Sequence, residues 1–137
     1  MKIKLDAGAY MPVRAHKTDA GLDLRAREAQ IIPWHGSACF DTGVHIALPR
    51  GYYGKIESKS GLNVHHNVVS CGGVIDEGYT GSIAVKLYNL GKADYEVHEG
   101  DKIAQLVIMP YAAPGVELVM VLDETERGAD GFGSTGR

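Results

Sequence analysis

The sequence predicts an all-β fold, in the form of a sandwich, jelly roll or barrel. Short apolar runs that alternate with a period of two recur along the chain, and residues typical of turns separate them. Glycine makes up 18 of the 137 residues, about twice its usual share of about 7%, and lies mostly between these runs. The length corresponds to one domain, and no internal repeat is present.

Four segments carry the strand pattern. Their apolar side chains alternate with polar ones or form continuous β-branched runs, as in buried strands. One of them, residues 102–110, ends on Pro110, which cannot donate a hydrogen bond to a ladder and therefore stops the strand. The four segments are residues 43–49, 82–90, 102–110 and 116–122. The stretch from Ser60 to Val69 is the one place where we expect a helical turn.

Composition excludes several classes of function. The formal net charge is −3, and no basic stripe is visible that would indicate binding to nucleic acid. No apolar run approaches the roughly 20 residues that a membrane helix needs. The first ten residues lack the apolar centre of a secretory signal, so we expect a cytoplasmic protein in which Cys39 and Cys71 are free thiols.

The C-terminal residues from Arg127 to Arg137 contain glycines in a G-x-G-x-x-G pattern. A dinucleotide-binding fingerprint needs a helix after the glycines, and the sequence has no residues left for one. Successive glycine N–H groups can still surround an anion, with hydroxyl and arginine side chains as further donors. The alternative is a disordered polar tail. We therefore expect a β domain over 1–122 and a mobile arm over 123–137.

Asp76 lies in a turn between two short β runs of the segment 72–81, which we expect to form a hairpin. The apolar pair Val74 and Ile75 comes before it and would hold its carboxylate at the edge of a buried surface, a suitable place for a general base. The alternative is that Asp76 caps its own turn by accepting backbone hydrogen bonds. Tyr79 could equally be a packing residue of the second run.

Three further segments could contribute to phosphate chemistry, although each is weakly specific alone. Lys59, Ser60 and Gly61 offer a cation, a hydroxyl and a free backbone amide at the end of a β run. Asp23 is a candidate ligand for a hard cation such as Mg²⁺, directly or through water. Gln105 is an amide in an apolar strand and needs a partner, either substrate or backbone. The histidines show no ligand spacing, so we assign no metal to them.

Taken together, these segments resemble the motifs of trimeric deoxyuridine triphosphatases (dUTPases). The similarity rests on five motifs in order between Ala20 and Gly136. They read AGLDLRA, KSGL, GGVIDEGYTGSIAVKLYN, GDKIAQLVI and RGADGFGSTG. The resemblance implies a distorted jelly-roll β-barrel, a homotrimer with active sites at subunit interfaces, and Mg²⁺-assisted hydrolysis of dUTP to dUMP and pyrophosphate. Such an enzyme limits uracil entry into DNA and supplies dUMP for thymidylate synthesis.

The resemblance also implies roles for individual residues. Asp76 matches the residue that activates the attacking water, with Gln105 contacting phosphate and water. Asp23 matches the acidic residue that holds the metal through its water shell, and Tyr79 the tyrosine that packs under deoxyribose. The remaining substrate-binding positions are Lys59, Ser60, Gly61, Ser70, Gly73, Val74, Ile75 and Ala84 in the domain, and Arg127, Phe132, Gly133, Ser134 and Thr135 in the arm. Among these, Phe132 matches the aromatic residue that closes over uracil.

Two positions depart from the usual family pattern. Lys59 stands where arginine is usual, which keeps the charge but loses the bidentate fork. Ser70 stands where many members have asparagine, so uracil recognition would depend more on backbone groups of the hairpin. The runner-up enzyme is a deoxycytidine triphosphate deaminase of the same fold, although the aromatic and glycine-rich arm favours dUTPase. If the chain were a regulatory protein that keeps the fold, we would expect an inserted segment or damaged motifs, and neither is obvious in the sequence.

Overall fold

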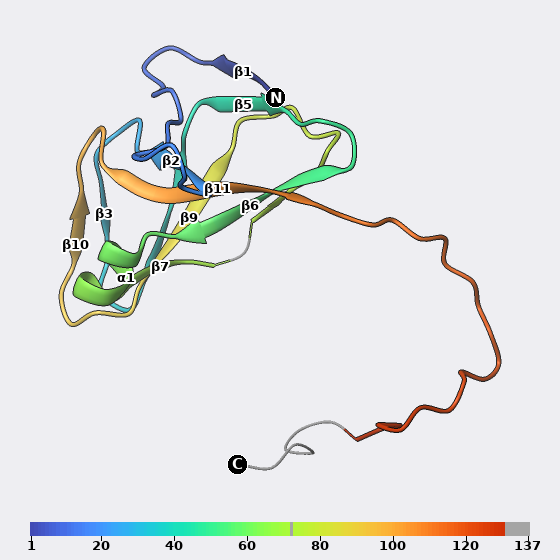
Figure 1. Ribbon diagram of the computed structural model, residues 1–137. Helices are drawn as coiled ribbons and strands as arrows, with labels where there is room; N and C mark the ends of the chain where they lie inside the picture. Colours follow the sequence, from blue (N-terminus) through green and yellow to red (C-terminus); the bar gives the residue numbers. More distant parts are fainter. Residues whose placement is uncertain (72, 131–137) are drawn as a thin grey trace.

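The computed structural model describes residues 1–71 and 73–130, and it confirms the all-β prediction (Figure 1). Antiparallel pairing joins the described strands into four sheets, ordered β2-β11-β6-β8, β4-β9-β7, β1-β5 and β10-β3. The elements are β1 (Lys2–Leu5), β2 (Gly21–Arg25), β3 (Gln30–Ile32), β4 (Ser37–Asp41), β5 (Val44–Ala47), β6 (Tyr52–Ser58), α1 (Ser60–His66), β7 (Val68–Ser70), β8 (Val74–Ile75), β9 (Ala84–Asn89), β10 (Tyr95–Val97) and β11 (Lys102–Pro110).

The core forms where the apolar faces of these sheets meet. In β9 the side chains of Val85 and Leu87 are buried while those of Ala84 and Lys86 are exposed, which is the predicted period of two. Leu106 of β11 is fully buried, in a central strand that pairs with both β2 and β6. Burial of each such side chain contributes about 1.5 to 3 kcal/mol, so the sheets are held together chiefly by apolar packing.

The helical turn expected near Ser60 is confirmed as α1. It has no side-chain cap at Lys59 and ends at Asn67, whose φ of 54° lies in the left-handed region. A seven-residue helix is too short to be stable alone. Leu62 is half-buried and packs against the core, so the β domain holds the helix in place.

The strand predicted over residues 116–122 is not formed, so that prediction is wrong for the single chain. After β11 the chain leaves the domain and runs outward (Figure 1). Val116 and Met120 are 100% and 98% exposed. β propensity mainly reports packing against neighbouring strands, and the described part of this chain places no strand beside the segment.

The hairpin predicted over residues 72–81 is only partly confirmed. A turn does follow Asp76, whose carbonyl accepts a hydrogen bond from the Tyr79 N–H at 3.0 Å. However, β8 pairs with β6, whereas β9 pairs with β4 and β7. The turn therefore connects a strand of the four-stranded sheet to a strand of the three-stranded sheet. β8 and β9 do not pair with each other, so they do not form a hairpin.

No helix in the described part of the chain is long and apolar enough to span a membrane. Cys39 and Cys71 are free thiols, as expected, and both are exposed.

Candidate active site

Strand β6 organises the predicted site residues into two groups, one at each of its ends. Described residues on both sides of position 72 lie along β6: Ser70 lies beside Ser58, and Ile75 lies opposite Gly54 in an antiparallel pairing. At about 3.3 Å per residue, the two ends of β6 are roughly 20 Å apart. Near the first end lie Lys59, Ser60, Gly61, Asp23 and Gln105. Near the second end lie Asp76 and Tyr79, which follow β8.

The first end presents backbone donors to solvent. Ser60 and Gly61 are exposed in the first turn of α1, where backbone N–H groups have no partner within a helix. Nothing lies within 4 Å of the point where a Cβ of residue 61 would stand. The space beside Gly61 can therefore admit a group that approaches the backbone closely.

Asp23 is a buried carboxylate between two lysines. It is 4% exposed, and its Oδ1 lies 2.5 Å from Lys59 Nζ. Its Oδ2 lies 2.7 Å from Lys102 Nζ and accepts no further hydrogen bond from the described residues. Burial raises the pKa of Asp23, but the ammonium groups of Lys102 and Lys59 outweigh that effect and lower the pKa below its usual value. Asp23 is therefore ionised at neutral pH.

Gln105 lies in β11 directly opposite Asp23 of β2 and Glu57 of β6. Its Nε2 donates to the carbonyl oxygen of Ser58 at 3.2 Å. The partner that the sequence left open is thus backbone in this structure, and the contact holds the amide beside the strand end that leads into Lys59. Its side chain also covers Gly21, where a Cβ would collide with it.

Ser70 connects β7 to the same end of β6. Its N–H donates to Ser58 Oγ at 2.9 Å, and the two hydroxyl oxygens are 3.1 Å apart. The Ser70 hydroxyl is therefore already engaged by Ser58.

Asp76 is exposed at the second end. Within the described residues, its turn is closed by the backbone carbonyl and no hydrogen bond reaches its carboxylate, so the side-chain cap considered as an alternative is not seen. Asp76 lines an open cavity of about 420 Å³ together with Tyr53, Val74, Glu77, Gly78 and Tyr111. An exposed carboxylate at the rim of a cavity is available to a bound molecule and to water.

The cavity wall is held by Glu77. Its Oε2 accepts hydrogen bonds from the Gly51 N–H at 2.8 Å and from the Tyr111 hydroxyl at 2.9 Å. The backbone bond from Gly51, followed by the bond from Tyr111, lowers the pKa of Glu77. The same contact raises the pKa of the Tyr111 hydroxyl. A charged Glu77 thus ties the Asp76 turn to the point where the C-terminal segment leaves β11.

The remaining described site residues lie before and after the Asp76 turn, Gly73, Val74 and Ile75 beside β6 and Ala84 in β9. Gly73 has a φ of +110°, and a Cβ there would stand 2.7 Å from the Cβ of Ile56, so only glycine fits without strain. Val74 is exposed and Ile75 is buried. Ala84 begins β9 and is exposed opposite Asp41.

Comparison with known proteins shows the family of this chain. A model of the dUTPase family matches residues 7–136. The chain belongs to the dUTPase family. It is 43% identical over 135 residues to the deoxyuridine 5′-triphosphate nucleotidohydrolase of Rattus norvegicus, a match that covers 98% of this chain and 66% of the rat protein. The chain thus spans just under two thirds of that relative.

Solved dUTPase structures share the fold. A mutant dUTPase of Staphylococcus bacteriophage 80alpha, bound to dUpNHpp, superposes with a TM-score of 0.93 at 30% identity and covers 99% of this chain and 98% of its own. A mutant dUTPase of Staphylococcus aureus phage phi11, whose structure details the coordination of a structural Mg(II) ion, gives a TM-score of 0.82 at 31% identity. That match covers 88% of this chain and 96% of the phage chain.

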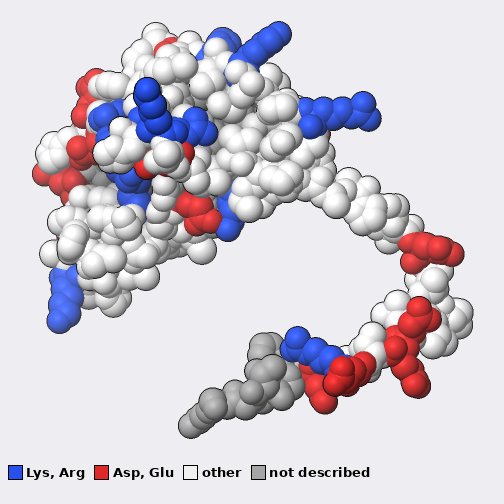
Figure 2. Space-filling model, in the orientation of Figure 1, with Lys and Arg blue, Asp and Glu red and all other residues white. Residues whose placement is uncertain are grey.

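The dUTPase arm motif falls mostly outside the described residues. Phe132, Gly133, Ser134 and Thr135 lie outside them. Arg127 is described, and its Nε donates to the carbonyl of Asp130 at 2.9 Å within a local turn. The segment before it carries several carboxylates and lies away from the mixed charges of the domain (Figure 2).

Several residues of the candidate site were not predicted from the sequence. Lys102 pairs with Asp23 across two strands, and only the pairing of β2 with β11 brings them together. Glu77 and Tyr111 meet although they are 34 residues apart. The only hint in the sequence was that Glu77 directly follows Asp76. A charged side chain in a turn also needs polar partners, so Glu77 could have been proposed as a residue that holds the turn.

Proposed function

We propose that this chain hydrolyses dUTP to dUMP and pyrophosphate, as a homotrimer assisted by Mg²⁺. In the proposed reaction, the oxygen of a water molecule bonds to the α-phosphorus, and the bond from that phosphorus to the bridging oxygen of the β-phosphate breaks. The protein would limit uracil entry into DNA and supply dUMP for thymidylate synthesis. A cytoplasmic location stays a prediction from the N-terminal residues.

The observation that carries the proposal is the position of Asp76. Its carboxylate is exposed at the rim of a cavity of about 420 Å³, within the part of the chain that matches the family. As general base, Asp76 takes the proton of the attacking water, a role that contributes about 10²- to 10⁴-fold to rate. Glu77 keeps the turn that carries Asp76 in place through Gly51 and Tyr111.

The first end of β6 suits the triphosphate. Ser60 and Gly61 offer backbone N–H groups, and Lys59 offers a cation that can move from Asp23 toward phosphate. Gln105, held beside Ser58, contacts phosphate and orients water. Together these groups stabilise the negative charge that develops during attack.

Asp23 fits the role of a magnesium ligand through water. Mg²⁺ keeps several waters and is usually bound by one or two carboxylates together with substrate phosphates. Asp23 is ionised, and its Oδ2 is engaged only by Lys102 among the described residues. In the described part of the chain no group of three or more acidic, histidine or cysteine side chains could hold a metal alone, so the phosphates would complete the site. When bound, Mg²⁺ neutralises phosphate charge and polarises the reacting phosphoryl group.

The separation of the two groups along β6 supports the homotrimer. One chain holds the Asp76 turn and the Lys59 end roughly 20 Å apart, which favours a site completed by another subunit. The outgoing segment also exposes Val116, Leu118 and Met120 almost completely. Contiguous exposed apolar side chains mark surfaces that associate, so this segment is suited to packing on another subunit.

Base and sugar selection would come from the segment between the two ends and from the arm. Backbone groups of Gly73, Val74 and Ile75, with Ser70 and Ala84 nearby, would contact uracil. Tyr79 would pack under the deoxyribose and leave no room for a 2′-hydroxyl. In the arm, Phe132 with Gly133 would cover the base, while Arg127, Ser134 and Thr135 would bind the γ-phosphate.

The test is pyrophosphate release from dUTP, dCTP, dTTP and UTP, each with and without Mg²⁺, together with sedimentation of the protein. We expect release from dUTP alone, dependent on Mg²⁺, by a trimer. Ammonia released from dCTP without pyrophosphate would identify a deaminase instead. Inactivity toward all four nucleotides would favour an interaction protein, and a stable active monomer would refute the shared site.

A further inference from the structure

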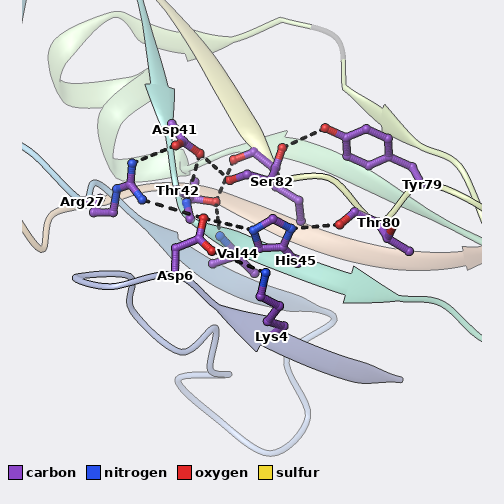
Figure 3. A network of polar contacts seen from close by, with 12 residues as sticks. Lys4, Asp6, Arg27, Asp41, Thr42, Val44, His45, Tyr79, Thr80 and Ser82 are labelled. Atoms are coloured by element: carbon purple, nitrogen blue, oxygen red, sulfur yellow. Dashed lines mark hydrogen bonds and ion pairs between the residues drawn. The ribbon is translucent and has the colours of Figure 1, made fainter.

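Residues 80–83, which follow Tyr79, are hydrogen-bonded to the corner between β4 and β5, residues 41–45 (Figure 3). The Tyr79 hydroxyl donates to the Ser82 carbonyl at 2.9 Å, so the ring folds back over its own loop. Gly81 lies against the hydroxyl end of the ring, and a Cβ there would collide with it. The position of the Tyr79 ring therefore depends on the position of residues 80–83.

Residues 80–83 are held by a series of hydrogen bonds to that corner. The Ile83 N–H donates to the Val44 carbonyl at 2.9 Å, and the Ile83 carbonyl accepts from the Thr42 hydroxyl at 2.7 Å. The Ser82 hydroxyl donates to a carboxylate oxygen of Asp41. Since Ile83 is fully buried, this side of the loop is fixed by the core.

The other side of the loop is held by His45 alone among the described residues. His45 Nδ1 lies 2.8 Å from the Thr80 carbonyl oxygen, and its Nε2 lies 3.0 Å from Asp6 Oδ2. Both partners are acceptors. A neutral imidazole has one N–H, so only the doubly protonated ring can donate to both.

Several charged groups surround His45. On β1, Lys4 is paired with His45 across the strands, and its Nζ lies 3.8 Å from Asp6 Oδ1. Arg27 reaches from the loop after β2, with one guanidinium nitrogen 3.9 Å from Asp6 Oδ2 and the other 2.8 Å from Asp41 Oδ2. Asp6, then the Thr80 carbonyl, raise the pKa of His45 above its usual value, against the opposing effects of burial and Lys4.

We propose that His45 is a positioning residue for Tyr79, and that its protonated form holds the Thr80 carbonyl and so fixes the sugar-binding ring. The inference rests on the proposed function and adds to it a residue outside the family motifs quoted above. When the ring loses its proton, the remaining N–H stays with the carboxylate of Asp6, the stronger acceptor. The Nδ1 lone pair then faces the Thr80 carbonyl, and that contact is lost.

The sign of the effect follows from the direction of the pKa change. A raised pKa means that the contact is complete below the ordinary histidine value of about 6.5 and is lost as the pH rises through the higher value in the folded protein. The KM for dUTP should therefore increase about three- to tenfold across this range, which corresponds to one hydrogen bond. The turnover number at saturation should change less, because Asp76 itself is untouched.

The experiment measures KM and kcat for dUTP from pH 5.5 to 8.5 in the full chain, in His45→Gln and in Asp6→Asn. In parallel, ¹⁵N NMR follows protonation of the His45 ring. The wild type should show a step in KM at the pKa of His45, and His45→Gln should lack that step. In Asp6→Asn the NMR titration should move to lower pH, because the carboxylate that favours the cation is gone. The step in KM should shrink or vanish in this variant, because a neutral ring without a carboxylate partner can keep its single N–H on the Thr80 carbonyl.

Protonation of the substrate cannot produce these differences between the three proteins. A phosphate group with a pKa of about 6 would change KM equally in the wild type, His45→Gln and Asp6→Asn. A pH profile of KM identical in the wild type and His45→Gln would overturn the inference. So would a step that keeps its full size in Asp6→Asn. Failure of the proposed function is distinct, because no protein would then release pyrophosphate at any pH.

Discussion

Replacement of Asp23 by asparagine tests the charge balance at the first end of β6. The change removes a buried carboxylate whose oxygens lie 2.5 Å from Lys59 Nζ and 2.7 Å from Lys102 Nζ. Loss of one partner from a fully buried ion pair costs about 3 to 5 kcal/mol. The lysine side chains are 27% and 39% exposed and can turn toward water, so we expect a smaller loss of about 2 to 3 kcal/mol in free energy of unfolding.

Urea unfolding at fixed protein concentration measures this loss, because association makes stability depend on concentration. The lowered pKa of Asp23 means that its stabilising effect is complete above the unfolded value of about 3.9 and is lost as the pH falls through the lower folded value. The difference between wild type and Asp23→Asn should thus be constant from pH 7 to 5 and shrink only below pH 4.

A double variant with Lys102→Met separates the ion pair from other effects of the substitution. If the two charges stabilise each other, the double variant loses less stability than the sum of the two single losses. A loss below about 0.5 kcal/mol in Asp23→Asn at pH 7 would contradict a stabilising buried ion pair, since that value is typical of an exposed pair. So would a difference that grows on acidification.

Four further outcomes are expected. Asp76→Asn should fold normally and lose about 10²- to 10⁴-fold in turnover, because an amide cannot accept the proton of water; unchanged turnover would remove Asp76 from its role. Deletion of residues 129–137 should abolish most activity with little change in melting temperature, whereas a large drop in melting temperature with activity retained would contradict an arm that acts on substrate. Glu77→Ala should reduce kcat while Glu77→Gln retains it, since glutamine still accepts from Tyr111; equal losses in both would show that the hydrogen bonds do not position the turn. Gly73→Ala should cost about 1 to 3 kcal/mol in urea unfolding because of its positive φ, and a neutral result would contradict that strain.

The limits of sequence reasoning are clearest where a segment meets its partners. The alternation in residues 82–90 predicted β9 correctly, because side-chain period is a local property. The run 116–122 has equal β propensity and yet forms no strand in the single chain. Propensity cannot report whether a neighbouring strand is present.

Residue type and spacing were enough to predict the β class, which the structure confirms, and to single out Asp76, Asp23 and Gln105 as candidates for the chemistry. Which side chains come into contact depends on strand pairing. Pairing of β2 with β11 placed Lys102 against Asp23, and β6 set the Asp76 turn roughly 20 Å from Lys59. The His45 contact with Thr80 joins residues 35 positions apart. Such contacts arise from strand pairing between distant segments, which no local pattern encodes.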